Sequence, residues 1–433
     1  MKIAQFSDLH YSNPNLAEVD RCFAYAVSQA IAAGINAAVI SGDSTDHALD
    51  LHAPAVAALA KQVRRLADHC PVLMLQGTYS HEPPGTLNVF RLLGGRYAVY
   101  VADEIKQVAL SVVGDWIASD GWRFDRLPDN ALAIFSCLPA VNKGAIAATV
   151  GAVDAAEAVG QVVADLLAGW GAVNRKAGRA GLACVGVSHG TVSGCVTEHG
   201  VPMAGLDHEF TTSALFAAAA SAFLLGHIHK HQSWQDGERL IAYPGSIGRL
   251  HYGEEGAKGF LLWDVTAHGA RYEFIKTPAR RMLHLTFDGP PDMAMVREAG
   301  REAAGAFVRV RWNVPEEDRD SVDRLAIEAA LQGAAEVKLE GRVVPVMRSR
   351  AGGISQAATL PEKVARWAEA AGVDAAGVLE RLAHMETLDV EAIVRGIATA
   401  EGADLPASVA HQAMTGGGAV PNAPADQQVE LFA

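Results

Sequence analysis

The first 265 residues alternate short apolar runs with segments of helical periodicity. Runs of strand length occupy residues 2–6, 37–40, 72–75, 182–187, 222–225, 240–243 and 259–265. Apolar residues recur at helical spacing in 16–33 and 54–67, and Gly34 follows the first of these segments. This many strands exceed one small sheet, so we expect an α/β fold in which two stacked sheets are flanked by helices, an αββα sandwich.

The pattern changes at about residue 280. Three strand-like runs, 282–287, 307–312 and 335–339, surround a helix that carries Arg and Glu, which predicts a small α+β domain. Short amphipathic helices are expected at 361–371, 374–384 and 389–400, and a Gly/Pro/Ala-rich tail follows. The predicted domains are therefore 1–278, 279–352, 353–410 and 411–433.

Composition indicates a folded protein of several domains. Of its 433 residues, 50% are hydrophobic and 20% are charged. No uncharged apolar run has the length of a membrane span, and the start of the chain lacks the features of a signal peptide. We expect a cytoplasmic protein with reduced, mostly buried cysteines. These cysteines are scattered and odd in number: Cys22, Cys70, Cys137, Cys184 and Cys195.

Charge is distributed unevenly along the chain. The net charge is −13, which argues against a protein that coats DNA but does not exclude a local nucleic-acid groove. Residues 280–350 hold 12 Lys/Arg and 12 Asp/Glu, whereas the remainder holds 36 − 12 = 24 basic and 49 − 12 = 37 acidic residues. The acidic part is also the part that contains the candidate metal ligands.

Aspartate and histidine side chains follow several of the predicted strands. The motifs are FSDLH with Asp8 and His10, VISGD with Asp43, LQGTYSHE with His81, VGVSHG with His189, and LLGHIHK with His227 and His229. Strand ends of an open α/β sheet converge at one edge, where ligands bind. Mixed carboxylates and imidazoles suit manganese, iron or zinc. A single histidine after a strand is usually structural, but five such sites in one chain predict a metal centre.

The order DLH, GD, SHG and GHIH resembles the calcineurin-like metallophosphoesterases. A further segment, YPGSIGRLHYGEEGAKGF at 243–260, is similar to the one that follows GHxH in SbcD-type nuclease subunits. The resemblance covers about residues 1–280, and the following domain loosely. It implies two divalent metal ions, expected to be manganese, with His81 as the catalytic residue above the scissile phosphate. The implied ligands are Asp8, His10 and His229 for the first metal, Asp43 as the bridge, and His189 and His227 for the second.

One motif departs from this family. The family has GNHD, in which the asparagine is a ligand of the second metal, whereas this chain has GTYSHE with two extra residues between Gly77 and His81. The hydroxyl of Thr78, that of Ser80, or a water molecule is expected in the place of the asparagine. The second metal is then bound more weakly, or the protein is a binding subunit with reduced catalysis.

The C-terminal parts suggest partners through the same resemblance. Residues 279–352 occupy the place of a DNA-capping domain, whose arginines either contact phosphates or pair with glutamates on a solvated surface. The helices at 361–400 occupy the place where the family docks an SbcC-like ATPase. The last residues, with Gln428, Val429, Leu431 and Phe432, look like the peptide by which bacterial proteins bind the sliding clamp.

These observations predict a metal-dependent DNA nuclease, exonuclease or endonuclease, that acts in double-strand break repair or recombination. The expected assembly is a homodimer with an SbcC-like ATPase. Two alternatives stay open: a phosphodiesterase for small molecules or nucleotides, and a non-catalytic subunit that binds DNA ends.

Overall fold

The computed structural model describes residues 1–47, 50, 52–93, 95–140, 155–197, 209–254, 256–345 and 353–400. The chain forms two compact units, Met1–Val343 and Val344–Ala433. The predicted clamp-binding residues Gln428, Val429, Leu431 and Phe432 lie outside the described residues.

The first sheet has six strands. Its order is β15 (Ala270–Lys276), β14 (Gly259–Val265), β1 (Lys2–Phe6), β2 (Ala37–Ile40), β3 (Val72–Leu75) and β4 (Val99–Ala102). The four strands β1 to β4 are parallel, whereas β14 runs antiparallel to β1 and to β15. The loops that follow β1, β2 and β3 therefore leave the sheet at the same edge.

The second sheet has seven strands. Its order is β12 (Gln232–Asp236), β13 (Arg239–Tyr243), β11 (Ala222–Gly226), β8 (Ala183–His189), β7 (Ala131–Leu138), β5 (Lys106–Ser111) and β6 (Trp116–Ala118). Strands β7, β8, β11 and β13 are parallel. A separate pair, β9 (Thr191–Val192) and β10 (Glu209–Phe210), follows β8.

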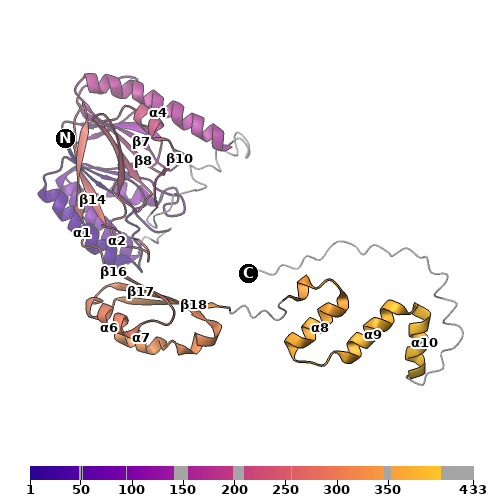
Figure 1. Ribbon diagram of the computed structural model, residues 1–433. Coiled ribbons are helices and arrows are strands. Elements are labelled where there is room, and N and C mark those ends of the chain that lie inside the picture. Colours follow the sequence, from indigo (N-terminus) through magenta and orange to yellow (C-terminus); the bar gives the residue numbers. More distant parts are fainter. Residues whose placement is uncertain are drawn as a thin grey trace. The chain divides into compact units, whose positions relative to one another are not determined.

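Side-chain alternation along β1 shows how the layers pack. Ile3 joins Trp263 and Phe135 in a core between the two sheets, whereas Phe6 points the other way into a core against the helices. Helices α1 (Leu16–Ala32) and α2 (Pro54–His69) cover that outer face, together with the 3₁₀ helix η1 (Thr86–Leu92). On the far face of the second sheet lie α4 (Ala155–Arg179) and α5 (Thr212–Ala217). Figure 1 shows α1 and α2 on one side of the strands and α4 on the other.

A small α+β element completes the first unit. It contains β16 (Met282–Asp288), α6 (Met293–Glu302), β17 (Phe307–Pro315), η2 (Glu316–Ser321), α7 (Arg324–Ala330) and β18 (Glu336–Val344), with β17 in the middle of the sheet. Val310, Trp312 and Ile327 belong to its own hydrophobic core. This core is separate from the cores of the two large sheets, within the same compact unit.

The described part of the second unit consists of helices. They are η3 (Ile354–Gln356), α8 (Leu360–Ala371), α9 (Ala376–Thr387) and α10 (Val390–Ala400). Thr359 caps α8 by accepting a hydrogen bond from the Glu362 amide, and Gly372 ends this helix in the left-handed conformation. Several large apolar side chains of these helices stay exposed, among them Trp367, Met385 and Val390.

The predicted two-sheet sandwich with flanking helices is confirmed, as are the small α+β element and the helices after it. All five cysteines are free and buried, in agreement with the sequence. Among the described residues, no helix is long and apolar enough to cross a membrane.

Candidate metal centre

Both sheets contribute side chains to one cluster of aspartates and histidines. Asp8 and His10 follow β1, and Asp43 follows β2 of the first sheet. His189 ends β8 and His227 follows β11 of the second sheet, where Gly226 pairs with His189. The carboxyl ends of parallel strands from two stacked sheets thus meet at one edge, as their order along the chain predicts.

The first ligand group contains Asp8, His10 and His229, whose ligand atoms lie within 4.8 Å of one another. The Nε2 atoms of His10 and His229 face each other at 3.0 Å. Asp8 also accepts the backbone N–H of His227 at 3.0 Å, which fixes its carboxylate against the β11 loop. Two imidazoles and one carboxylate therefore converge on a single point.

The second ligand group contains Asp43, His189 and His227, again within 4.8 Å. Asp43 Oδ2 lies 3.2 Å from His189 Nε2 and 3.9 Å from His10 Nε2. The same carboxylate oxygen therefore faces a histidine of each group, which is the position required of a bridging ligand.

Hydrogen bonds fix the tautomers of two of these histidines. His189 Nδ1 donates to the carbonyl oxygen of Ser41 at 2.8 Å, and His229 Nδ1 donates to Glu254 Oε1 at 3.0 Å. In each ring Nε2, the atom that faces the cluster, is consequently the nitrogen that can offer a lone pair to a metal. One carboxylate and two imidazoles per group fit a borderline divalent cation such as manganese, iron or zinc.

The backbone at the cluster adopts an unusual conformation. Left-handed φ angles occur at Asp8 (50°), His10 (47°), Asp43 (51°) and His227 (108°), where a side chain other than glycine is strained. Such strain persists only where the surroundings impose it, and it concentrates at functional sites. The conformation turns side chains that follow buried strands toward one centre.

Neighbouring glycines allow the loops that carry the candidate ligands to approach one another closely. A Cβ atom on Gly42 would lie 2.2 Å from His189 Nδ1, and one on Gly77 would lie 2.2 Å from the Asp43 backbone nitrogen. Any side chain at these two positions would therefore displace a ligand.

The electrostatic environment favours a cation. Burial works against ionisation of Asp43, but the neighbouring histidines, His189 above all, outweigh it and hold the pKa of Asp43 well below its usual range. Burial alone would lower the pKa of His189, yet the Asp43 carboxylate outweighs it and raises that pKa to about 10. Burial and the nearby His229 lower the pKa of His10, whose ring is therefore neutral. A metal cation would take the place of the proton on His189.

His81 lies beside the ligands and is oriented by Asp46. Its Nδ1 lies 3.1 Å from Asp46 Oδ1, and its ring meets the edge of His10 with 4.7 Å between centroids. Thr45 Oγ1 donates to the His81 carbonyl at 3.1 Å. With 27% of its side chain exposed, His81 is reachable from solvent, whereas the six ligands are mostly enclosed.

Thr78 occupies the position next to the second ligand group. Its Oγ1 lies 3.2 Å from Asp43 Oδ2 and 3.2 Å from His189 Nε2. Its backbone nitrogen donates to Asp43 Oδ1 at 2.6 Å. Ser80 is exposed. Of the two hydroxyls considered for the place of the asparagine, the structure brings that of Thr78 into the cluster.

Three supporting carboxylates were not predicted from the sequence. Asp46 belongs to the GDSTD stretch, so its position three residues after Asp43 was the available signal. Glu82 accepts the amides of Ser44 at 2.5 Å and Gly77 at 2.6 Å, and burial, with the Asp43 charge, raises its pKa to about 7. Glu254 lies within the segment 243–260, but its partner His229 is 25 residues away in the chain.

The arginines predicted to contact DNA are partly engaged within the chain. Arg309 and Arg311 both donate to Glu340, at 2.9 and 2.7 Å. Arg280 pairs with Glu18 at 3.4 Å and lies over the ring of Phe307. For these three residues, the structure shows the paired alternative.

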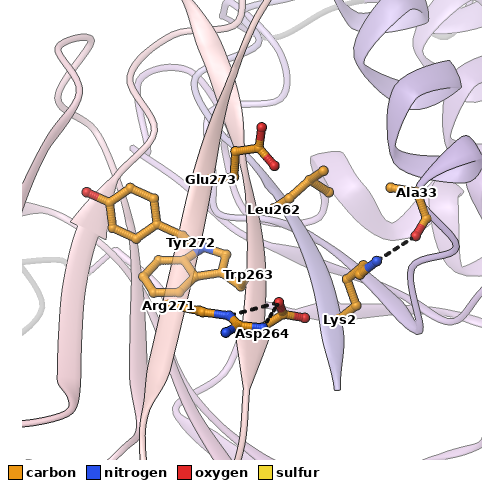
Figure 2. A pocket seen from close by; sticks show the side chains of 8 residues that line it. All are labelled: Lys2, Ala33, Leu262, Trp263, Asp264, Arg271, Tyr272 and Glu273. Atoms are coloured by element: carbon orange, nitrogen blue, oxygen red, sulfur yellow. Dashed lines mark hydrogen bonds and ion pairs between the residues drawn. The ribbon is translucent and has the colours of Figure 1, made fainter.

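A surface pocket of about 290 Å³ lies at the start of β1, at the end of the strand opposite to the metal centre (Figure 2). Its lining includes Lys2, Asp264 and Tyr272. Lys2 donates a hydrogen bond to the Ala33 carbonyl at 2.9 Å, and Asp264 pairs with Arg271. Because Lys2 begins β1 and the ligands follow its last residue, this pocket is separate from the metal centre.

Comparison with known proteins gives one limited sequence match. No family model matches the chain. A stretch of 90 residues is 36% identical to the uncharacterized metallophosphoesterase YhaO of Bacillus subtilis. This match spans 21% of the chain and 21% of that relative, so the chain matches about a fifth of the relative's length.

Solved structures give weaker likenesses. A dimetal phosphatase from Danio rerio has a TM-score of 0.38 at 11% identity, covering 63% of this chain and 98% of that one. GAP50, the anchor in the inner membrane complex of Plasmodium, has a TM-score of 0.39 at 12% identity, covering 64% and 84%. A predicted phosphoesterase from Streptococcus pneumoniae reaches 0.24 at 11% identity, covering 63% and 97%. At these TM-scores no functional argument follows, and the similarity to a metallophosphoesterase rests on the 90-residue match.

Proposed function

We propose that this chain is a two-metal phosphodiesterase that cleaves DNA, as an SbcD-type nuclease subunit in double-strand break repair or recombination. The observation that carries the proposal is the pair of ligand groups that meet at Asp43, each of which combines residues from strand ends of both sheets. The match to a metallophosphoesterase over 90 residues supports the same chemistry.

The residues divide the work of phosphodiester hydrolysis among them. Asp8, His10 and His229 would hold one cation, His189 and His227 the other, and Asp43 would be a ligand of both. Two bound divalent cations supply charge neutralisation and a water molecule of lowered pKa. His81, held by Asp46 at 3.1 Å, is placed to stabilise or protonate the leaving oxygen.

Thr78 supports an active enzyme over a non-catalytic subunit. Its hydroxyl lies 3.2 Å from both Asp43 Oδ2 and His189 Nε2, where it complements the second ligand group. We therefore assign Thr78 the place of the asparagine in GNHD.

The DNA substrate and the partners rest on the resemblance together with exposed surfaces. The helices α8 to α10 expose Trp367 (48%), Met385 (65%) and Val390 (76%), which suits docking to an SbcC-like ATPase. Manganese as the metal, the homodimer and the sliding-clamp interaction of the tail remain predictions.

A phosphodiesterase for small molecules or nucleotides is the second candidate. The observation that favours it is the pairing of Arg309 and Arg311 with Glu340, because paired guanidinium groups attract a phosphate backbone less.

The test measures hydrolysis of linear double-stranded DNA and of bis(p-nitrophenyl) phosphate with Mn²⁺. The wild type is compared with Asp43→Ala and His81→Ala, with and without an SbcC-like ATPase. His268→Ala is the matched control, because this histidine is exposed on the turn between β14 and β15.

DNA cleavage that both site variants lose and the control keeps supports the nuclease. Hydrolysis of the small diester alone overturns the DNA substrate and favours the second candidate. Absence of hydrolysis of both substrates by the wild type, with DNA still bound, overturns the enzyme and leaves an end-binding subunit.

A further inference from the structure

A buried ion pair lies directly behind His229. Glu254 Oε1 accepts the His229 Nδ1 hydrogen at 3.0 Å, and Glu254 Oε2 lies 3.1 Å from Lys258 Nζ. The Glu254 and Lys258 side chains are 0% and 1% exposed. Both residues belong to the loop between β13 and β14, far from His229 in the chain.

The lysine also holds the backbone of His229. Lys258 Nζ donates to the His229 carbonyl at 2.8 Å and to Ser246 Oγ at 2.8 Å, in addition to its pairing with Glu254. All three ammonium hydrogens thus have an acceptor. The Leu250 amide donates to Glu254 Oε2 at 3.0 Å. The pair therefore fixes His229 through both its ring and its main chain.

Stability alone is a poor reason for this arrangement. Removing two charges from water is costly, and replacing a buried ion pair by apolar residues is often neutral or stabilising. The pair does, however, hold the His229 ring with its lone pair on Nε2, which faces His10 Nε2 at 3.0 Å. A carboxylate behind an imidazole also makes the ring a stronger base toward a metal.

The two ligand groups differ in this respect. His189 donates to a neutral acceptor, the carbonyl of Ser41 at 2.8 Å, whereas His229 donates to a carboxylate that a lysine balances. We propose that Glu254 and Lys258 are positioning residues that set the metal affinity of the Asp8–His10–His229 group, while the His189 group is independent of them. This inference rests on the proposed two-metal function.

The experiment is a titration of the metal-free full chain with Mn²⁺ by calorimetry, with the melting temperature of each metal-free variant recorded. The variants are Glu254→Gln and the double change Glu254→Gln/Lys258→Met, which leaves no buried charge alone. His229→Ala and His189→Ala identify the signal of each site.

Glu18→Gln is the matched control. Glu18 is a similarly buried carboxylate (3% exposed) that supports the same loop by accepting the amide of Arg249 at 3.3 Å. It also accepts the amide of Arg280, after β15, at 2.7 Å, and no hydrogen bond joins it to a candidate ligand in the described residues. It therefore separates an effect on loop folding from an effect on His229.

We expect both Glu254 variants to weaken the site that His229→Ala removes by about 10- to 100-fold, and to leave the other unchanged. Glu18→Gln should bind as the wild type does. Two wild-type affinities in a folded double variant would overturn the inference while the proposed function stands. A wild type that binds fewer than two Mn²⁺ ions would instead overturn the proposed function itself.

Discussion

The metal cluster and the small domain both gather charged side chains, but they hold them differently. Asp8 and Asp43 are 0% and 2% exposed, and the cationic neighbours of Asp43 are histidines, whose charge depends on a proton. In the small domain, Glu340 lies 2.9 Å from Arg309, 2.7 Å from Arg311 and 3.1 Å from Lys338, within reach of solvent.

The aspartates of the metal cluster carry charge that is available for binding a cation, whereas the charge of Glu340 is already offset by neighbouring cations. The buried aspartates attract cations, and a metal cation can take the place of the proton that His189 carries. The Glu340 charge is offset by three permanent cations, those of Arg309, Arg311 and Lys338, and is screened by water, so these ion pairs contribute little to stability. Substitutions in the two regions should therefore differ in kind.

The largest effect is expected for Asp43→Asn. The variant keeps the shape of the side chain but removes the shared negative charge, so hydrolysis and Mn²⁺ binding should both fall below detection. Rate assays and calorimetry check this. Glu340→Gln, the corresponding change in the small domain, should leave hydrolysis and Mn²⁺ binding unchanged. Equal losses in the two variants would contradict the proposed difference between the two regions.

Next in size is His81→Ala, which should lower kcat by about 10²- to 10⁴-fold because a proton-transfer group is lost. Mn²⁺ binding should persist, since His81 is outside both ligand groups that meet at Asp43. Asp46→Asn should give a smaller loss in kcat with a changed pH profile, because it disturbs the orientation of His81. A variant that also loses both metals would contradict the assignment.

Glycine substitutions compare packing in the two regions. Gly77→Ala places a Cβ 2.2 Å from the Asp43 nitrogen, which should lower the free energy of unfolding by about 1–3 kcal/mol. Gly333→Ala in the small domain meets nothing within 4 Å and should be neutral or slightly stabilising. Urea unfolding of the two metal-free variants measures the contrast. Equal free energies of unfolding would show that Gly77 is not tightly packed against Asp43.

Changes at Thr78 should have a moderate effect confined to one metal. Thr78→Val removes the hydroxyl but keeps the shape, so the second Mn²⁺ should bind about tenfold more weakly, or about 1.4 kcal/mol. Thr78→Ser keeps the hydroxyl and should retain the wild-type affinity. Calorimetric titration measures the affinity of both variants. If Thr78→Val binds the second Mn²⁺ as tightly as the wild type does, a water molecule and not Thr78 takes the place of the asparagine.

The smallest effect concerns Glu340 and pH. Hydrogen bonds from Arg309, then Arg311, lower the pKa of Glu340 from 4.5 to about 2. A lowered folded-state pKa gives stability that is present above pH 4.5 and lost as the pH falls through about 2. Glu340→Gln should therefore cost less than about 1 kcal/mol at pH 7, because the pair is exposed to screening. The difference from wild type should shrink in unfolding curves below pH 4.5, and a constant difference would contradict the ion-pair origin.

Much of the fold could be predicted because its central strands are continuous apolar runs. The runs that became β1, β2, β3 and β14 were located to the residue, since strands buried on both faces contain few polar side chains. The region from β4 to β7 and the long helix α4 were not predicted. Short strands such as β6 have no clear alternation, and the Ala- and Gly-rich start of α4 gives a weak periodic signal.

The cluster of candidate ligands could be predicted because each member lies at or shortly after the end of a strand, so local sequence fixes its place on the sheet edge. Glu254 and Lys258 could not be found this way. His229 lies beside them only because β13 and β14 belong to different sheets. The spacing of residues along the chain does not indicate this arrangement. For the place of the asparagine, the sequence left Thr78, Ser80 or a water molecule. Only the three-dimensional path of the loop after β3 shows that the Thr78 hydroxyl, and not that of Ser80, lies beside Asp43.

The pairing of His10 with His229 across 219 positions of sequence has a consequence for synthesis. A ribosome delivers Asp8 and His10 first, and at about 5–20 residues per second the nascent chain carries this half-site for ten seconds or more. During that interval the ligand set is incomplete. A cation can contact Asp8 and His10, but the chain cannot yet enclose it. A metal at this site would therefore be enclosed only late in maturation, after both sheets have come together.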